Sequence, residues 1–208
     1  LLPTERFWGR DLDILMIERR LQKHNELLIS GMASIGKTSL LKHLASWWIE
    51  TGWVQHSAYI VLGERIPSFR KLCQSLAVQV GMVTEHESVE PEQLLSFFRE
   101  NRCAVLFDEL NGAINVDGFP RNPLYTDTLR AFHRMLREAV GSQSLIVLAS
   151  RGTLGSFAEF TVQDNAYELR GLDSDSAADL CRQLLARPPQ YNEKDVLDVE
   201  NLVCTTAG

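Results

Sequence analysis

The sequence predicts a doubly wound α/β domain, in which a parallel five-stranded sheet is flanked by helices on both faces. Short apolar segments alternate along the chain with longer segments of helical periodicity. The apolar segments are continuous runs, which is typical of strands buried on both faces of a parallel sheet. Right-handed crossovers between such strands produce the doubly wound arrangement.

Each strand is predicted where a short apolar run is bounded by polar residues or glycine. The five predicted strands are residues 26–30, 57–63, 103–110, 144–150 and 166–172. Helices are predicted where apolar residues recur every three or four positions, as Ile14, Ile17 and Leu21 do in the first of them. The helical segments are 11–25, 37–52, 69–81, 93–101, 126–141 and 173–187, with a last helix starting near Glu193.

Composition narrows the class of protein further. The chain has 208 residues, and its 45% hydrophobic and 23% charged residues suit either one large domain or one domain with a small appendage. The net charge of −6 argues against a nucleic-acid binder, and no apolar stretch is long enough to predict a membrane span. The four cysteines lack metal-ligand spacing, so we expect reduced thiols and a cytoplasmic protein. Because the chain starts at Leu1 rather than methionine and ends within a pattern, we also expect it to be a piece of a longer protein.

The segment GMASIGKTS, between the first predicted strand and the next helix, predicts a phosphate-binding loop. Gly31, Gly36, Lys37 and Thr38 satisfy the pattern G-x-x-x-x-G-K-[ST]. The glycines let backbone N–H groups surround a phosphate at the positive end of the helix dipole. Lys37 would bridge the β- and γ-phosphates, and the Thr38 hydroxyl would bind Mg²⁺. The remaining loop residues are Met32, Ala33, Ser34, Ile35 and Ser39.

Two further strand ends carry candidate catalytic residues. The run LFDE ends a strand with Asp108 and Glu109, and a parallel neighbour of the first strand would place Asp108 beside Thr38. Asp108 would then hold Mg²⁺ while Glu109 polarises the attacking water. Arg151 follows the strand 144–150, where it either reaches the γ-phosphate or is an exposed loop arginine.

Five segments in this order resemble the STAND-class signalling NTPases, the AAA+-related switches that include NB-ARC and NACHT proteins. They are FWGRD, GMASIGKT, LFDE, ASR and YELRGLDSDSAADLC. The resemblance implies that the adenine side of the site is lined by Phe7, Trp8, Gly9 and Arg10. Asp108–Glu109 replaces the two aspartates of many NB-ARC members, and Asn111 and Gly112 replace further acids of NACHT members, so both subgroups stay open.

The resemblance also implies a domain division and a function. Residues 1–172 would form the nucleotide-binding domain, in which 1–25 are the adenine-side segment and first helix, and 173–208 would begin a helical lid domain. The expected protein is a switch that binds ATP or ADP with Mg²⁺, hydrolyses ATP slowly and controls self-association of a larger signalling protein of the innate-immunity, NOD-like kind. The alternatives are a AAA+ motor or DNA-loading ATPase, and a nucleotide-binding scaffold without hydrolysis. The residues do not fix ATP over GTP.

Overall fold

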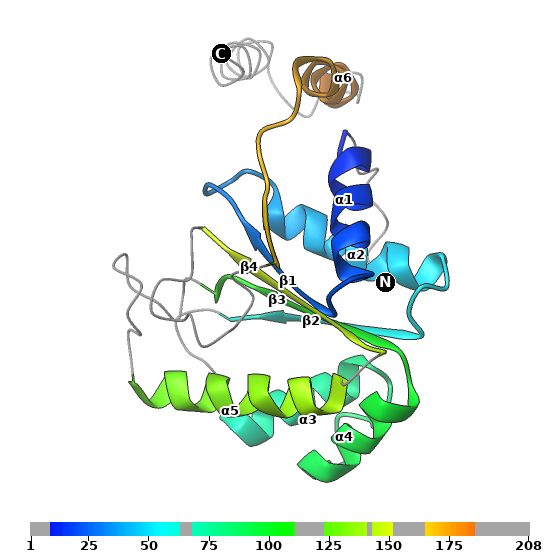
Figure 1. The fold of residues 1–208 in the computed structure, drawn as a ribbon, viewed down its shortest axis with the longest axis vertical. Coiled ribbons are helices and arrows are strands. Elements are labelled where there is room, and N and C mark those ends of the chain that lie inside the picture. Colours follow the sequence, from blue (N-terminus) through cyan, green and yellow to red (C-terminus); the bar gives the residue numbers. More distant parts are fainter. Residues whose placement is uncertain (1–8, 63–67, 111–122, 141–142, 152–164, 186–208) are drawn as a thin grey trace.

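The computed structural model describes residues 9–62, 68–110, 123–140, 143–151 and 165–185. Within them lies one five-stranded sheet in which every pairing is parallel, with helices on both faces (Figure 1), so the predicted fold class is confirmed. The strands are β1 (Glu26–Ser30), β2 (His56–Val61), β3 (Cys103–Asp108), β4 (Leu145–Ser150) and β5 (Ala166–Glu168).

The order of the strands corrects one expectation. Across the sheet the order is β2-β3-β4-β1-β5, so β3 is not a neighbour of β1 as the sequence analysis assumed. The chain returns from β3 through α5 (Pro123–Val140) to place β4 between them, and β5 then pairs with the other side of β1. All five strands point the same way, so their carboxyl ends still share one edge of the sheet.

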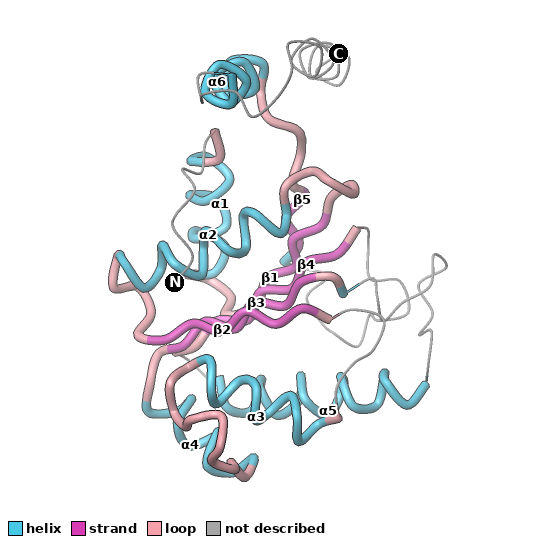
Figure 2. Tube along the Cα trace, turned by 180° about the vertical axis from the view of Figure 1, so that it is seen from behind, coloured by secondary structure: helices cyan, strands magenta, loops and turns pink. Residues whose placement is uncertain are grey.

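The helices divide between the two faces of the sheet, as Figures 1 and 2 show. One face is covered by α1 (Asp11–Leu21) and α2 (Lys37–Glu50), and the other by α3 (Phe69–Gln79), α4 (Pro91–Glu100) and α5 (Pro123–Val140). The last described helix, α6 (Ser174–Leu185), follows β5 and lies beyond α1 at the far end from α3–α5. The helix expected near Glu193 lies outside the described residues. None of the helices in the described part of the chain is long and apolar enough to cross a membrane.

Two hydrophobic clusters, one on each face, hold these layers together. All residues of β3 and β4 are buried, which explains their continuous apolar sequence. Alternate β3 residues enter opposite clusters: Leu106 packs with the α1 and α2 residues, and Phe107 with those of α3, α4 and α5. The fully buried Trp48 anchors α2 in the first cluster. This packing fixes the start of α2 above the carboxyl ends of the central strands.

Candidate nucleotide-binding site

The loop between β1 and α2 has the backbone that the glycine pattern predicts. Ser34 and Gly36 have positive φ angles of 60° and 100°, and Gly36 is the residue directly before α2. A Cβ atom on Gly31 would lie 2.7 Å from the carbonyl oxygen of Leu169, so a side chain there would collide with the segment after β5. Only glycine therefore lets the loop start this close to that backbone.

Lys37 lies inside this loop. The residue is 9% exposed, and its Nζ atom donates to the carbonyl oxygens of Gly31 at 2.7 Å and Met32 at 2.6 Å. Burial lowers the pKa of Lys37; the negative charge of Asp108 opposes that shift, and the positive charge of Arg151 adds to it. The ammonium is thus held at the centre of the loop by carbonyl groups that an anion would replace.

The carboxyl end of β3 reaches the start of α2. Thr38 Oγ1 donates to Asp108 Oδ2 at 2.6 Å, although β4 separates β1 from β3. The contact forms because α2 crosses the sheet from β1 toward β2 and β3, which brings its first turn over the end of β3. Asp108 is 3% exposed. The predicted pairing of Thr38 with Asp108 is therefore correct, while the predicted adjacency of their strands is wrong.

Glu109 occupies an unusual backbone position beside this pair. Its φ angle is 56°, and its backbone N–H donates to Asp108 Oδ1 at 2.8 Å. Left-handed φ angles in non-glycine residues are uncommon and cluster at functional sites. The turn leaves the Glu109 side chain exposed directly after the buried Asp108.

Arg151 follows β4, which lies between β1 and β3 in the sheet. It is exposed, and it is close enough for its charge to lower the pKa of Lys37. The structure therefore brings Arg151 to the same edge of the sheet as Lys37, Asp108 and Glu109.

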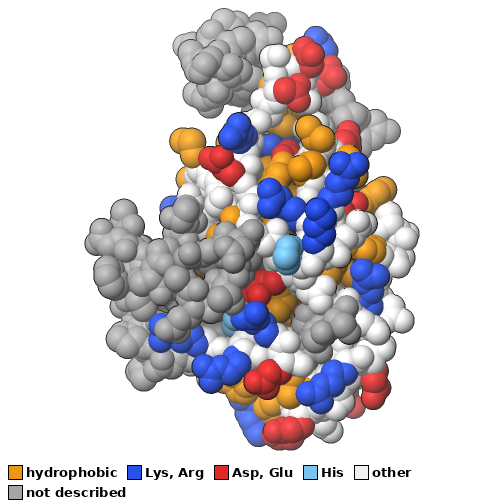
Figure 3. Space-filling model, in the orientation of Figure 1, with side chains coloured by type: hydrophobic (Ala, Val, Ile, Leu, Met, Phe, Trp, Pro, Cys, Tyr) orange, Lys and Arg blue, Asp and Glu red, His pale blue; other side chains and the backbone are white. Residues whose placement is uncertain are grey.

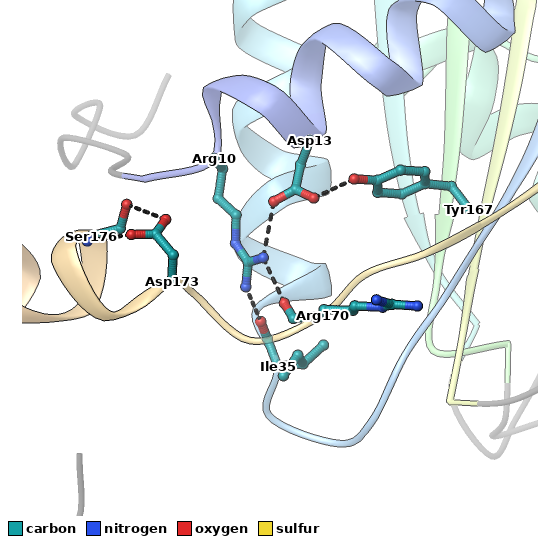
Figure 4. A network of polar contacts seen from close by, with 7 residues as sticks. All are labelled: Arg10, Asp13, Ile35, Tyr167, Arg170, Asp173 and Ser176. Atoms are coloured by element: carbon teal, nitrogen blue, oxygen red, sulfur yellow. Dashed lines mark hydrogen bonds and ion pairs between the residues drawn. The ribbon is translucent and has the colours of Figure 1, made fainter. Parts of the chain in front are cut away.

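A second group of contacts joins the start of α1 to the loop (Figure 4). The buried Arg10 guanidinium donates to Ile35 O at 2.9 Å and to Arg170 O at 2.6 Å, and it pairs with Asp13 at 2.9 Å. The hydroxyl of Tyr167, on β5, donates to the other oxygen of Asp13. Burial and this hydrogen bond raise the pKa of Tyr167 to about 12, so the phenol stays a donor. Arg10 thus ties three separate segments together through backbone carbonyls.

Gly9, directly before Arg10, lies against the start of α6. Its φ angle is +67°, and a Cβ atom there would lie 2.5 Å from the Cβ of Ser176, so the chain can pass only without a side chain. Ser176 belongs to the first turn of α6, where its N–H and hydroxyl donate to Asp173 at 2.9 Å and 2.7 Å. Phe7 and Trp8, the other two predicted adenine-side residues, lie outside the described part of the chain.

The arrangement fits a nucleotide with Mg²⁺. Loop residues Met32, Ala33 and Ser34, and also Thr38 and Ser39 in the first turn of α2, are exposed beside the buried Lys37. The helix start supplies unpaired backbone N–H groups and a positive dipole end, which suit phosphate. Hydroxyl and carboxylate oxygens of Thr38 and Asp108 are the hard ligands that Mg²⁺ prefers.

Sequence reasoning missed Tyr59. Its hydroxyl donates at 2.6 Å to Asp108 Oδ2, the oxygen that also accepts the hydrogen bond from Thr38. A tyrosine in an apolar strand carries no motif, and its nearness to Asp108 becomes visible only when β2 is known to pair with β3.

Fold and site together define a P-loop NTPase domain. A family model described as the NACHT domain matches residues 25–188, which is most of the chain, and the chain therefore belongs to the NACHT family. Of the two subgroups left open by the sequence motifs, this match selects NACHT. No curated protein sequence matches the chain.

Several solved structures share the fold. A DNA replication initiation factor aligns with a TM-score of 0.57 and 15% identity, covering 96% of this chain and 57% of its own. Drosophila ORC bound to DNA aligns with a TM-score of 0.56 and 12% identity, covering 98% of this chain and 52% of its own. AMPPCP-bound DnaA from Aquifex aeolicus aligns with a TM-score of 0.51 and 14% identity, covering 94% of this chain and 56% of its own. The chain thus spans little more than half the length of each, and identities this low establish the fold alone.

The position of Lys37 generates a prediction about binding. Replacing Lys37 by alanine removes the only ammonium held inside the described loop, so the affinity for Mg-ATP should fall by at least about tenfold, or roughly 1.4 kcal/mol. Isothermal titration calorimetry at one salt concentration measures this. The matched control is Lys71→Ala, which removes an exposed lysine from α3 on the opposite face of the sheet. Equal affinities in wild type and Lys37→Ala would contradict a phosphate-binding loop.

Proposed function

We propose that this NACHT domain is a regulatory ATPase switch, which binds ATP or ADP with Mg²⁺, hydrolyses ATP slowly and controls self-association of a larger signalling protein. The observation that supports this most is the 2.6 Å contact of Thr38 with Asp108. It joins the phosphate loop to a strand-end acid pair, and both parts are needed for hydrolysis as well as binding.

Each residue at this edge has a distinct role in the proposal. Thr38 and Asp108 would hold Mg²⁺, which supplies neutralisation of phosphate charge when bound. Lys37 would turn its ammonium from the loop carbonyls to the phosphates. The exposed Glu109 carboxylate would accept a proton from the attacking water, and Arg151 would contact the γ-phosphate.

The contacts of Arg10 with two separate segments support a switch rather than an isolated binding site. Arg10 bonds at once to Ile35 in the loop and to Arg170 in the segment that leads to α6. A displacement of the loop between nucleotide states would therefore be transmitted to α6, where we place the beginning of the lid domain, residues 173–208. A nucleotide can shift this equilibrium only by its difference in affinity for the two arrangements. Contacts of Lys37, Asp108 and Arg151 with the γ-phosphate and Mg²⁺ would provide that difference.

Hydrolysis is tested at Glu109. Glu109→Gln should leave the affinity for ATP within about twofold and abolish phosphate release, because an amide cannot act as a general base. Binding is measured by calorimetry and hydrolysis by released phosphate, with Glu100→Gln on the exposed end of α4 as the matched control. Wild-type turnover in Glu109→Gln would favour the scaffold that binds nucleotide without hydrolysing it.

A second candidate is a DNA-loading ATPase, since one protein with this fold is ORC bound to DNA. Against it stands the net charge of −6. Figure 3 shows a small group of Lys and Arg side chains on one part of the face, bordered by Asp and Glu rather than continued as a basic stripe. Neutralisation of DNA phosphates supplies most non-specific affinity.

We therefore expect no duplex binding at about 0.15 M salt, where non-specific binders show dissociation constants of roughly 10⁻⁴–10⁻⁶ M. Fluorescence anisotropy with a labelled duplex measures this, and light scattering in ADP and in a slowly hydrolysed ATP analogue follows self-association. Micromolar, salt-sensitive DNA binding that strengthens with ATP would favour the loader instead of the switch.

A further inference from the structure

The Asp108 carboxylate has a second side-chain partner besides Thr38. Tyr59 lies in the middle of β2, outside every motif that the sequence carries, yet its hydroxyl is 2.6 Å from Asp108 Oδ2. Thr38 Oγ1 lies at the same distance from the same oxygen. The buried acid at the centre of the proposed Mg²⁺ site is therefore held from two directions, by α2 and by β2.

The register of the sheet explains how Tyr59 reaches this acid. Tyr59 is aligned with Leu106 in the β2–β3 pairing, and Val61 with Asp108. Side chains two residues apart on a strand share a face, so Leu106 and Asp108 both face α2. Tyr59 packs against the same hydrophobic cluster as Leu106. Its long side chain then extends along the sheet to the diagonal neighbour, and phenol is the group that spans this distance with a donor at its tip.

Two further contacts hold Tyr59, one at its ring and one at its backbone. The Lys42 ammonium, on α2, lies 5.7 Å from the ring centroid, a cation–π distance. The backbone N–H of Tyr59 faces the outer edge of the sheet, where no further strand of the described residues pairs with β2, and it donates to Gln79 Oε1 of α3 at 2.7 Å. The phenol is thus presented to Asp108 by contacts that do not involve the phosphate loop.

The hydrogen bonds of Asp108 indicate what Tyr59 does. Oδ1 accepts a hydrogen bond from the Glu109 backbone N–H, while Oδ2 accepts one from the Thr38 hydroxyl and one from the Tyr59 hydroxyl. Under the proposed function the Thr38 hydroxyl binds Mg²⁺, which leaves Tyr59, among the residues that the structure describes, as the side-chain donor that keeps Oδ2 oriented. Donors behind a metal-binding carboxylate fix its direction, and removing one typically lowers metal affinity about 10- to 100-fold.

We propose that Tyr59 is a positioning residue for the Mg²⁺ site, which holds the Asp108 carboxylate in place while Thr38 exchanges its hydrogen bond for the metal. This inference rests on the proposed function of the domain, because it assigns a partner to the same acid. Burial and the contact with Asp108 also raise the pKa of Tyr59. The inference itself is carried by geometry, because the phenol donates to Asp108 Oδ2 at 2.6 Å.

The test is Tyr59→Phe, which deletes one hydroxyl and keeps the packed ring. Binding of an ADP with a fluorescent N-methylanthraniloyl group is titrated with Mg²⁺ and, separately, in EDTA. We expect the Mg²⁺ concentration at half-effect to rise about tenfold or more, with the affinity in EDTA unchanged within about twofold. Ser57→Ala is the matched control, since it deletes another hydroxyl of β2 that donates to α2, at the Ala45 carbonyl oxygen, and not to Asp108; its Mg²⁺ dependence should stay that of wild type.

The outcomes separate this inference from the function on which it rests. If wild type binds the nucleotide with Mg²⁺ dependence and Tyr59→Phe shows the same dependence, the positioning role is wrong and the switch proposal stands. If wild type does not bind the nucleotide, both are wrong.

Tyr59→Phe made in an Asp108→Asn background supplies a second measurement. The hydroxyl acts through Asp108, so its loss should have no further effect on Mg²⁺ dependence there, and an undiminished effect would overturn the inference. Circular dichroism of each variant verifies that the fold is retained.

Discussion

The hydrogen bond from Thr38 to Asp108 joins two parts of the chain that are 70 residues apart in sequence. Thr38 stands in the first turn of α2, directly after the phosphate loop, and Asp108 ends β3, which is separated from β1 by β4. The two can meet only if β1, β4 and β3 run parallel and end at one edge, and if α2 crosses that edge. The sheet order, the buried strands and the packing of α2 through Trp48 all serve this geometry.

Around that contact the charged groups are arranged in a consistent way. Lys37 is buried among loop carbonyls, Asp108 is nearly inaccessible, and the exposed groups Glu109 and Arg151 flank them. A buried ammonium without a strong partner is costly, and its pKa is lowered accordingly. Phosphate oxygens in the loop would supply the negatively charged partner that the Lys37 ammonium lacks among the loop carbonyls. The hydrogen bonds of Asp108 orient its carboxylate toward Thr38, where a divalent cation would bind.

The sequence was sufficient to predict the features that depend on short segments of the chain. The five strands, six of the seven helices and the need for glycine at Gly31 and Gly36 follow from periodicity and from one motif, and the described structure contains each of these features. The predicted adjacency of β1 and β3 was wrong because short apolar runs are alike in pattern and carry no information on strand order, so β4 was not placed between them. Tyr59 was missed for the same reason. The Arg10 contacts were also beyond sequence reasoning, since their acceptors at Ile35 and Arg170 are backbone carbonyls, which any residue provides.

The central claim is that Thr38 and Asp108 act as one Mg²⁺ site for a bound nucleotide, and a double-mutant cycle measures this directly. Calorimetry of ADP binding with Mg²⁺ and with EDTA would compare wild type, Thr38→Val, Asp108→Asn and the double variant. If the two residues form one site, each single change removes most of the Mg²⁺-dependent gain in affinity and the double change removes little more, a coupling of about 0.5–3 kcal/mol. Additive losses, or a wild-type affinity that does not respond to Mg²⁺, would contradict it.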